Sequence, residues 1–231
     1  MKCPGQDTQY WKPGAIFEVK CPECGGSVEF FKDDTSRKCP ACGHRFINPK
    51  MDFGCASYCQ YAEQCLGGLP PELLAQKEEM LKDRVAVEVK RYFKSDFKKI
   101  GHAMRVARYA ERIGKFESGN LAVILSAAYL QDVGSGPAST ENGKCAEARN
   151  ILEKLGARER LIDEVCEILN QSGRPSPAAS VNLRVVFDAD RIASLEERQK
   201  SDPMPDASLA SLIEEELLTE TGKNEAKKVL L

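Results

Sequence analysis

The stretch that decides most of the fold is Ile100-Gly-His102-Ala-Met-Arg105-Val-Ala-Arg108-Tyr-Ala110, whose apolar residues recur at helical spacing. The pattern extends in both directions, because from residue 72 onward the chain is rich in Leu, Ala, Glu, Lys and Arg and contains no long alternating stretch. Helices are expected at about 71–94, 96–115, 119–132, 142–155, 158–171, 180–198 and 206–230. We therefore predict a helical domain over residues 96–231, preceded by a linker helix at 69–95.

The composition changes abruptly near Gly67-Gly-Leu-Pro-Pro71. Upstream of this boundary, residues 1–68 contain eight of the ten cysteines, the only Trp and short β-type runs such as 27–31. Cysteines crowded into so short a segment favour a small metal-binding module. The expected fold class is mainly α: a small β zinc-ribbon module in front of an all-helical domain.

Two knuckles, Cys21-Pro-Glu-Cys24-Gly and Cys39-Pro-Ala-Cys42-Gly, are separated by fourteen residues. This spacing is typical of a structural zinc site with four thiolate ligands, and we place the zinc ribbon at residues 19–48. Residues 28–32 and 37–38 are expected to pair as the hairpin that joins the knuckles. His44 is an alternative ligand, but with four thiolates present it is expected to be a solvated knuckle residue.

A second cysteine set consists of Cys3, Cys55, Cys59 and Cys65. Four thiolates can hold either a second zinc ion or a [4Fe–4S] cluster, and buried free thiols are the alternative. The remaining two, Cys145 and Cys166, stand apart on predicted helices, where a cysteine usually behaves as a small buried hydrophobe. We expect them to be separate core residues.

Charge and hydropathy exclude several classes of partner. The chain has 33 basic and 35 acidic residues, so no bulk field would gather nucleic acid or an anionic membrane. The most apolar stretch, 121–130, is too short to span a bilayer. We expect a soluble cytoplasmic protein, and in that reducing compartment cysteines bind metal more often than they form disulfides.

Three motifs follow one another in the helical part: the His102 stretch, then Ala127-Ala-Tyr-Leu-Gln131-Asp132-Val-Gly134, then Val185-Val-Phe-Asp188-Ala-Asp190-Arg191-Ile. Together they resemble the HD-domain phosphohydrolases. That family places a His on one helix, a His-Asp pair at the end of another and a later Asp around a divalent metal. With Thr219-Glu-Thr-Gly222-Lys223-Asn-Glu-Ala226, which looks like the closing helix of bacterial members, the resemblance covers residues 88–231.

Position by position, the resemblance implies that His102, Asp132 and Asp190 are metal ligands. The His of the family's His-Asp pair is replaced by Gln131, whose amide oxygen is a poor ligand for a transition metal. One His with two carboxylates suits a harder ion such as Mn²⁺ or Mg²⁺. The alternative without a metal site is that His102 is an ordinary, partly buried helix residue and that Asp132 and Asp190 are helix-terminus and surface carboxylates.

The missing histidine decides the functional prediction. We expect a nucleotide- or phosphate-binding or regulatory protein with little or no hydrolase activity, with Arg105 and Arg191 as candidate phosphate contacts and the ribbon as a site for a protein partner. One alternative is an active metal-dependent phosphohydrolase that acts on a nucleotide or phosphate ester. Another is a redox or metal sensor that uses a cluster on Cys3, Cys55, Cys59 and Cys65.

Overall fold

The structure is a computed structural model. It describes residues 14–32, 34, 36–50, 71–135, 143–171 and 174–231. The chain divides into two compact units, Met1–Lys77 and Glu78–Leu231. None of the described helices combines the length and the apolar character that a membrane crossing requires.

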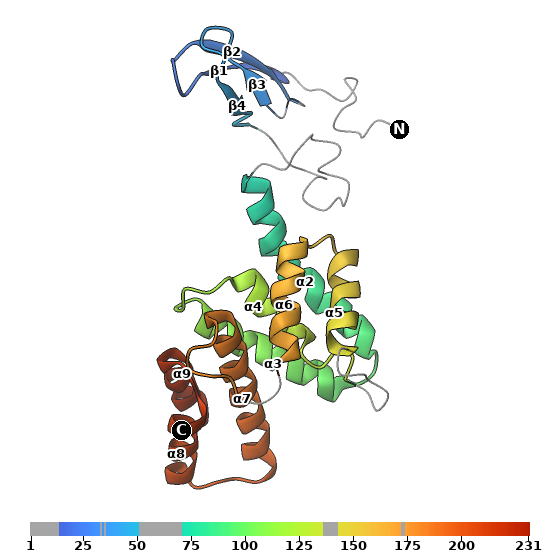
Figure 1. The fold of residues 1–231 in the computed structure, drawn as a ribbon, viewed down its shortest axis with the longest axis vertical. Coiled ribbons are helices and arrows are strands. Elements are labelled where there is room, and N and C mark those ends of the chain that lie inside the picture. Colours follow the sequence, from blue (N-terminus) through green and yellow to red (C-terminus); the bar gives the residue numbers. More distant parts are fainter. Residues whose placement is uncertain (1–13, 33, 35, 51–70, 136–142, 172–173) are drawn as a thin grey trace. The chain divides into compact units, whose positions relative to one another are not determined.

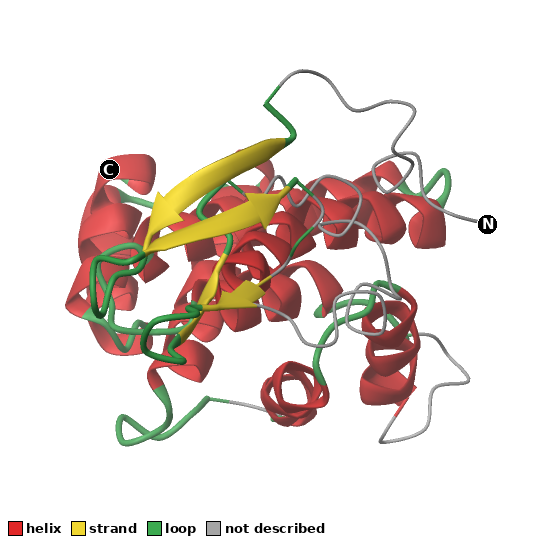
Figure 2. Cartoon of the chain, turned by 90° about the horizontal axis from the view of Figure 1, so that it is seen from above, coloured by secondary structure: helices red, strands yellow, loops and turns green. Residues whose placement is uncertain are grey.

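The N-terminal unit contains two separate strand pairs (Figures 1 and 2). Strand β1 (Ile16–Lys20) pairs antiparallel with β2 (Ser27–Phe31), and β3 (Ser36–Lys38) pairs antiparallel with β4 (Arg45–Ile47). Each pair is closed by one of the cysteine knuckles. The predicted pairing of residues 28–32 with 37–38 is therefore wrong, because each knuckle already reverses the chain and gives every strand a nearer partner.

Within the described part of this unit, residues 14–50 with gaps at 33 and 35, the core is very small. Phe30 and Val28 are buried together with the sulfur-bearing Cys21 and Cys39, and Phe46 packs edge-on against Phe30 with the ring centroids 5.2 Å apart. So few apolar side chains cannot stabilise a fold of this size alone. A metal ion bound by the cysteines would supply stability that this core lacks.

The helices run in the order α2 (Pro71–Phe93), α3 (Phe97–Gly114), α4 (Leu121–Leu130), α5 (Gly143–Lys154), α6 (Glu159–Asn170), α7 (Val181–Ser201), α8 (Asp206–Glu216) and α9 (Glu220–Leu230) (Figure 1). Apart from the last two, they agree with the predicted ranges to within a few residues. The expected mainly α fold class is confirmed.

Helix α4 is the central element of the helical unit. It packs against α3, α6 and α7, and Val123, Ile124 and Leu130 are fully buried. Its start is set by Asn120, whose side chain accepts hydrogen bonds from the backbone N–H groups of Ala122 and Val123. Because this helix is apolar on all sides, its C-terminal end is held firmly inside the fold.

The predicted single helix at 206–230 is wrong, because the chain breaks between α8 and α9. The cause is Asp188 on α7, a fully buried carboxylate. It accepts hydrogen bonds from the backbone N–H groups of Leu218 and Thr219, each at 2.8 Å, and from the Thr219 hydroxyl at 2.6 Å. Thr219 in turn caps α9 by accepting a hydrogen bond from the Gly222 N–H.

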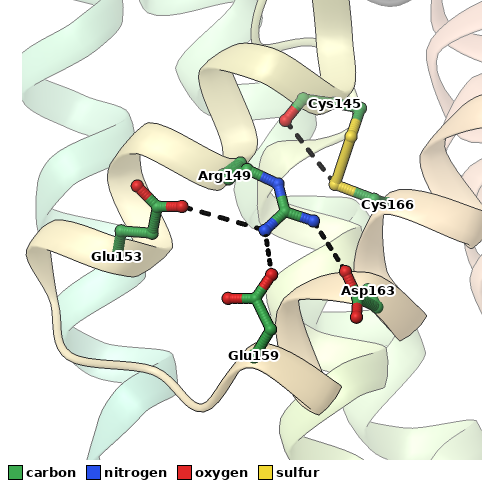
Figure 3. The surroundings of a disulfide bond; sticks show 6 residues. All are labelled: Cys145, Arg149, Glu153, Glu159, Asp163 and Cys166. Atoms are coloured by element: carbon green, nitrogen blue, oxygen red, sulfur yellow. Dashed lines mark hydrogen bonds and ion pairs between the residues drawn. A yellow bond between two sulfur atoms is a disulfide. The ribbon is translucent and has the colours of Figure 1, made fainter.

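Cys145 on α5 and Cys166 on α6 form a disulfide, with their Cα atoms 4.9 Å apart (Figure 3). The expectation of two separate core thiols is therefore wrong. The two cysteines are 21 residues apart in sequence, and the α5–α6 hairpin folds back so that they face each other. Helical periodicity predicted each helix, but it did not predict this register between them.

Candidate functional site

The four ribbon cysteines form a compact cluster of sulfur atoms. Cys21 Sγ lies 3.7 Å from Cys42 Sγ, Cys24 Sγ lies 3.5 Å from Cys39 Sγ, and all four sulfurs lie within 4.8 Å of one another. A regular tetrahedron with Zn–S bonds of about 2.3 Å has sulfur–sulfur edges of about 3.8 Å. The predicted cysteine cluster is confirmed, and its donors and spacing fit a tetrahedral metal ion.

The backbone of the two knuckles is the same. Cys21 N–H donates to the Gly26 carbonyl and Cys39 N–H donates to the His44 carbonyl, both at 2.8 Å. Gly25 and Gly43 both have φ +72°, a conformation that favours glycine. The nearby backbone N–H of Cys42 is the main cause that lowers the pKa of the Cys39 thiol to about 7, against the effect of burial. In contrast, and despite a backbone hydrogen bond to each thiol that acts the other way, the neighbouring sulfurs raise the pKa of Cys24 and raise that of Cys42 to about 12, so a bound cation is needed to hold all four as thiolates.

His44 and the second cysteine set were the other candidate metal ligands in this part of the chain. The ring of His44 stacks on Phe46 with the centroids 6.1 Å apart, and the cysteine cluster is formed without it. The predicted second set, Cys3, Cys55, Cys59 and Cys65, lies outside the described residues. Its metal or cluster stays a prediction.

The HD-like positions are brought together by three helices. His102 lies on α3, Asp190 lies on α7, and Gln131 and Asp132 directly follow α4. His102 Nε2 lies 3.1 Å from Asp190 Oδ1. The structure thus joins α3 to α7 through the first and the last residue of the predicted set.

A further carboxylate, Glu197, completes the surroundings of His102. Its Oε1 lies 3.0 Å from His102 Nδ1, and the same oxygen accepts a hydrogen bond from Arg105. Sequence reasoning missed Glu197, although it lies seven residues after Asp190 and therefore on the same face of α7. Arg105, predicted as a phosphate contact, is paired with this carboxylate.

The carboxylates make His102 strongly basic. Its pKa rises to about 9, chiefly because of the hydrogen bond with Asp190, with burial opposing the shift and with Glu197 and the charge of Asp132 supporting it. The imidazole is therefore protonated at neutral pH. A metal ion would have to displace this proton before it could bind His102.

The described geometry does not fit a metal ion held by the predicted HD-like ligands. Among the described residues, the ribbon cysteines are the one group of three or more such side chains with ligand atoms close enough to share an ion. His102, Asp132 and Asp190 do not form such a group. The side-chain oxygen of Gln131 is buried and has no hydrogen-bond partner among the described residues, so an unsatisfied acceptor lies beside Asp132. No catalytic step through a metal follows from this arrangement.

A pocket of about 430 Å³ lies beside these positions. Its polar lining includes Gln131 and Asp190, which connects it to the HD-like motif. The other polar residues of the lining are Lys144, Gln171, Arg174, Arg191 and Glu216. The apolar part of the lining consists of Ile168, Leu169, Pro175, Leu183, Val186 and Phe187. The pocket combines an apolar wall with cationic groups.

The three cations of the pocket differ in their pairing. Arg191 donates from its guanidinium to the carboxylate of Glu216, and Arg174 donates to the backbone carbonyl of Glu215 at 2.6 Å. Lys144 makes no hydrogen bond or ion pair with any residue that the structure describes. Lys144 is therefore the cation whose charge is most available to a bound anion.

Comparison with known proteins supports the family resemblance. A family model described as "HD domain" matches residues 100–195, which include His102, Gln131, Asp132 and Asp190. The chain matched no curated protein and no solved structure. The matched residues run from α3 into α7 and include the His102–Asp190 pair and every residue of the pocket lining except Glu216. Residues 100–195 of this chain are an HD domain.

Proposed function

We propose that the pocket beside Gln131 and Asp190 binds a nucleotide or another phosphate ester, and that the protein acts by binding this ligand, with little or no hydrolase activity. The observation that carries the proposal is the ammonium group of Lys144, which has no partner among the described residues, in a pocket whose lining also includes the apolar side chain of Phe187. The pocket volume of about 430 Å³ lies within the usual range for small-molecule sites.

The two kinds of lining suit the two parts of such a ligand. A planar base or other apolar group would pack against Phe187 and Leu183, whereas a phosphate group would pair with Lys144 and with the remaining N–H groups of Arg174. Arg191 is already neutralised by Glu216, so its contribution as a phosphate contact requires that pair to open.

We propose little or no hydrolase activity because the candidate metal ligands, Gln131 and His102, are poorly suited to hold a catalytic metal ion. Gln131 provides an amide oxygen where the family resemblance implies imidazole, and His102 is engaged by carboxylates at both ring nitrogens. Activation of a metal-bound water therefore has poor support from these residues.

Calorimetric titration with AMP, ADP and inorganic phosphate tests the proposal. We expect binding by the wild-type protein and a loss of about tenfold in affinity in Lys144→Ala, as the removal of one charged contact predicts. Lys228→Ala is the matched control, because Lys228 is an exposed lysine on α9 that does not line the pocket. Absence of binding by all three probes would refute the proposal.

The alternative of an active metal-dependent phosphohydrolase is favoured by one observation, the buried and unpartnered Oε1 of Gln131 next to Asp132. It would be tested by assay of phosphate esters and nucleotides with added Mn²⁺ or Mg²⁺, comparing wild type, Asp132→Ala and Gln131→His. Equal background rates in the three proteins would exclude it. Activity in Gln131→His alone would identify the histidine as the missing component.

For the ribbon, we propose that its ion is zinc, that this zinc is structural and that the module contacts a protein partner. Its near-balanced charge gives little support for a grip on nucleic acid. A cytoplasmic location is part of the same proposal. Metal analysis of the purified full-length protein would distinguish zinc from iron and would test the proposed sensor cluster on the second cysteine set.

A further inference from the structure

The Cys145–Cys166 disulfide joins α5 to α6, two helices that each contribute residues to the pocket lining. Cys145 directly follows Lys144 in the first turn of α5. Cys166 lies on α6, two residues before Ile168, which is part of the apolar wall. The disulfide (Figure 3) therefore joins the turn of α5 that carries Lys144 to α6, the helix that contributes Ile168 to the apolar lining.

Other contacts hold α5 against α6, but they begin one turn later. Figure 3 shows the guanidinium of Arg149 between Glu159 and Asp163, with the Asp163 carboxylate 2.6 Å from Arg149 Nη2. Ala148 and Leu152 are fully buried on the same helix. These contacts do not depend on the disulfide, so they keep α5 in place when it is absent.

The first turn of α5 is held less firmly than the rest of the helix. Lys144 is without a described partner there, and Cys145 packs against the core with a side chain that is only partly buried. Breakage of the disulfide would therefore release this turn selectively, while the rest of α5 stays packed. The position of the Lys144 ammonium group would become less well defined.

We propose that Cys145 and Cys166 form a reversible disulfide that regulates the pocket by fixing the turn that carries Lys144. This inference rests on the proposed function for its effect on ligand binding, whereas the disulfide and the ordering of the turn are independent of it. The ligand-binding form is the oxidised one.

The chemistry requires a small disulfide of the glutathione class as oxidant. The more accessible thiolate, Cys145, attacks one sulfur of that disulfide, whose S–S bond breaks and releases one small thiolate. Cys166 then attacks the Cys145 sulfur, and the second small thiol leaves. Two protein thiols are thus oxidised to one disulfide while one small disulfide is reduced to two thiols, which take up the two protons. Reduction follows the same steps in reverse.

Little rearrangement is needed between the two states. Cys166 Sγ lies 3.6 Å from the carbonyl oxygen of Cys145, within reach of a thiol hydrogen bond (Figure 3). In the reduced protein the Cys166 thiol, a weak donor, can still reach this carbonyl, but such a bond holds the turn far less firmly than the covalent link. The pair is therefore suited to repeated closure rather than to a single permanent crosslink.

The first experiment uses the full-length, metal-loaded protein equilibrated with reduced or oxidised glutathione. Free thiols are alkylated, the disulfide is reduced and labelled differently, and the peptides that contain Cys145 and Cys166 are identified by mass spectrometry. Hydrogen exchange of residues 144–148 is measured in both forms. We expect a disulfide in the oxidised protein and faster exchange of this turn after reduction. Free thiols under oxidising conditions, or identical exchange in the two forms, would overturn the proposal.

The second experiment compares the binding of ADP and inorganic phosphate by the two forms. We expect reduction to weaken binding by about fivefold, the lower end of usual coupling between sites. The double variant Cys145→Ser/Cys166→Ala is the control and should bind like the reduced protein under both conditions. Equal affinity of the two wild-type forms would overturn the coupling to the pocket. If neither form binds a probe, the proposed function fails, and the hydrogen-exchange result still decides whether the disulfide orders the turn.

Discussion

His102 Nδ1 lies 3.0 Å from Glu197 Oε1, and this contact links α3 to α7 outside the motif that identified the domain. The same carboxylate accepts from Arg105. The histidine is therefore oriented by a pair of charged residues, with its other nitrogen directed at Asp190. Whatever binds near Asp190 meets an imidazole whose orientation and protonation are set by its neighbours.

Replacement of Glu197 by Gln should lower the pKa of His102. The value of about 9 has the hydrogen bond with Asp190 as its main cause, and Glu197 raises it further. Because one carboxylate partner is lost, we expect the pKa of His102 to fall by about one unit. NMR titration of the imidazole protons measures this change. Glu196→Gln is the control, because Glu196 lies on the same helix but forms its hydrogen bonds with Tyr109 and Lys200. An unchanged His102 pKa in Glu197→Gln would contradict the geometry.

The stability of the helical domain should fall as the pH rises above neutrality. The folded-state pKa of His102, about 9, is higher than the ordinary histidine value of 6.5, so folding favours the protonated form. The resulting stabilisation is complete below pH 6.5 and is lost as the pH rises through 9. After a discount for solvent screening we expect about 1–2 kcal/mol in the free energy of unfolding. Denaturant unfolding of wild type and His102→Gln between these pH values measures the difference, which should be absent in the variant.

Removal of metal should unfold the ribbon and leave the helices intact. The ribbon has a core of few buried side chains, whereas the helical unit has its own large core. A chelator should therefore abolish the dispersed NMR signals of Phe30 and Val28 while the far-UV helical signal changes little. Cys39→Ser should lower the zinc content by about one equivalent per chain. Retention of the ribbon signals without metal would show that the thiolates are not its main support.

Loss of Asp188 should destabilise the domain severely. Asp188→Ala leaves two backbone N–H groups and the Thr219 hydroxyl without their acceptor in a buried site, which predicts a cost of about 2–4 kcal/mol. Glu167→Ala, an exposed change on α6, should stay within about 0.5 kcal/mol of wild type. Chemical denaturation of the two variants provides the comparison. A small effect at position 188 would mean that the break between α8 and α9 has another cause.

The sequence predicted the features that depend on local pattern. Helical periodicity placed α2 to α7, and the paired knuckles identified the cysteine cluster, because both signals are contained within short segments. The pairing of Cys145 with Cys166 and the role of Glu197 were missed, since each depends on the register between two helices. The break before α9 was missed for the same reason, because a buried residue of α7 causes it.

The contacts of Asp188 also determine how the HD domain can be isolated. The family match ends at residue 195, but the groups that satisfy this buried carboxylate come from Leu218 and Thr219. A fragment trimmed to the matched residues would expose an unpaired acid in its interior and would lose Glu216, the partner of Arg191 at the pocket. A fragment meant to fold on its own should therefore continue past the matched residues 100–195 to the end of α9, the helix that Thr219 caps.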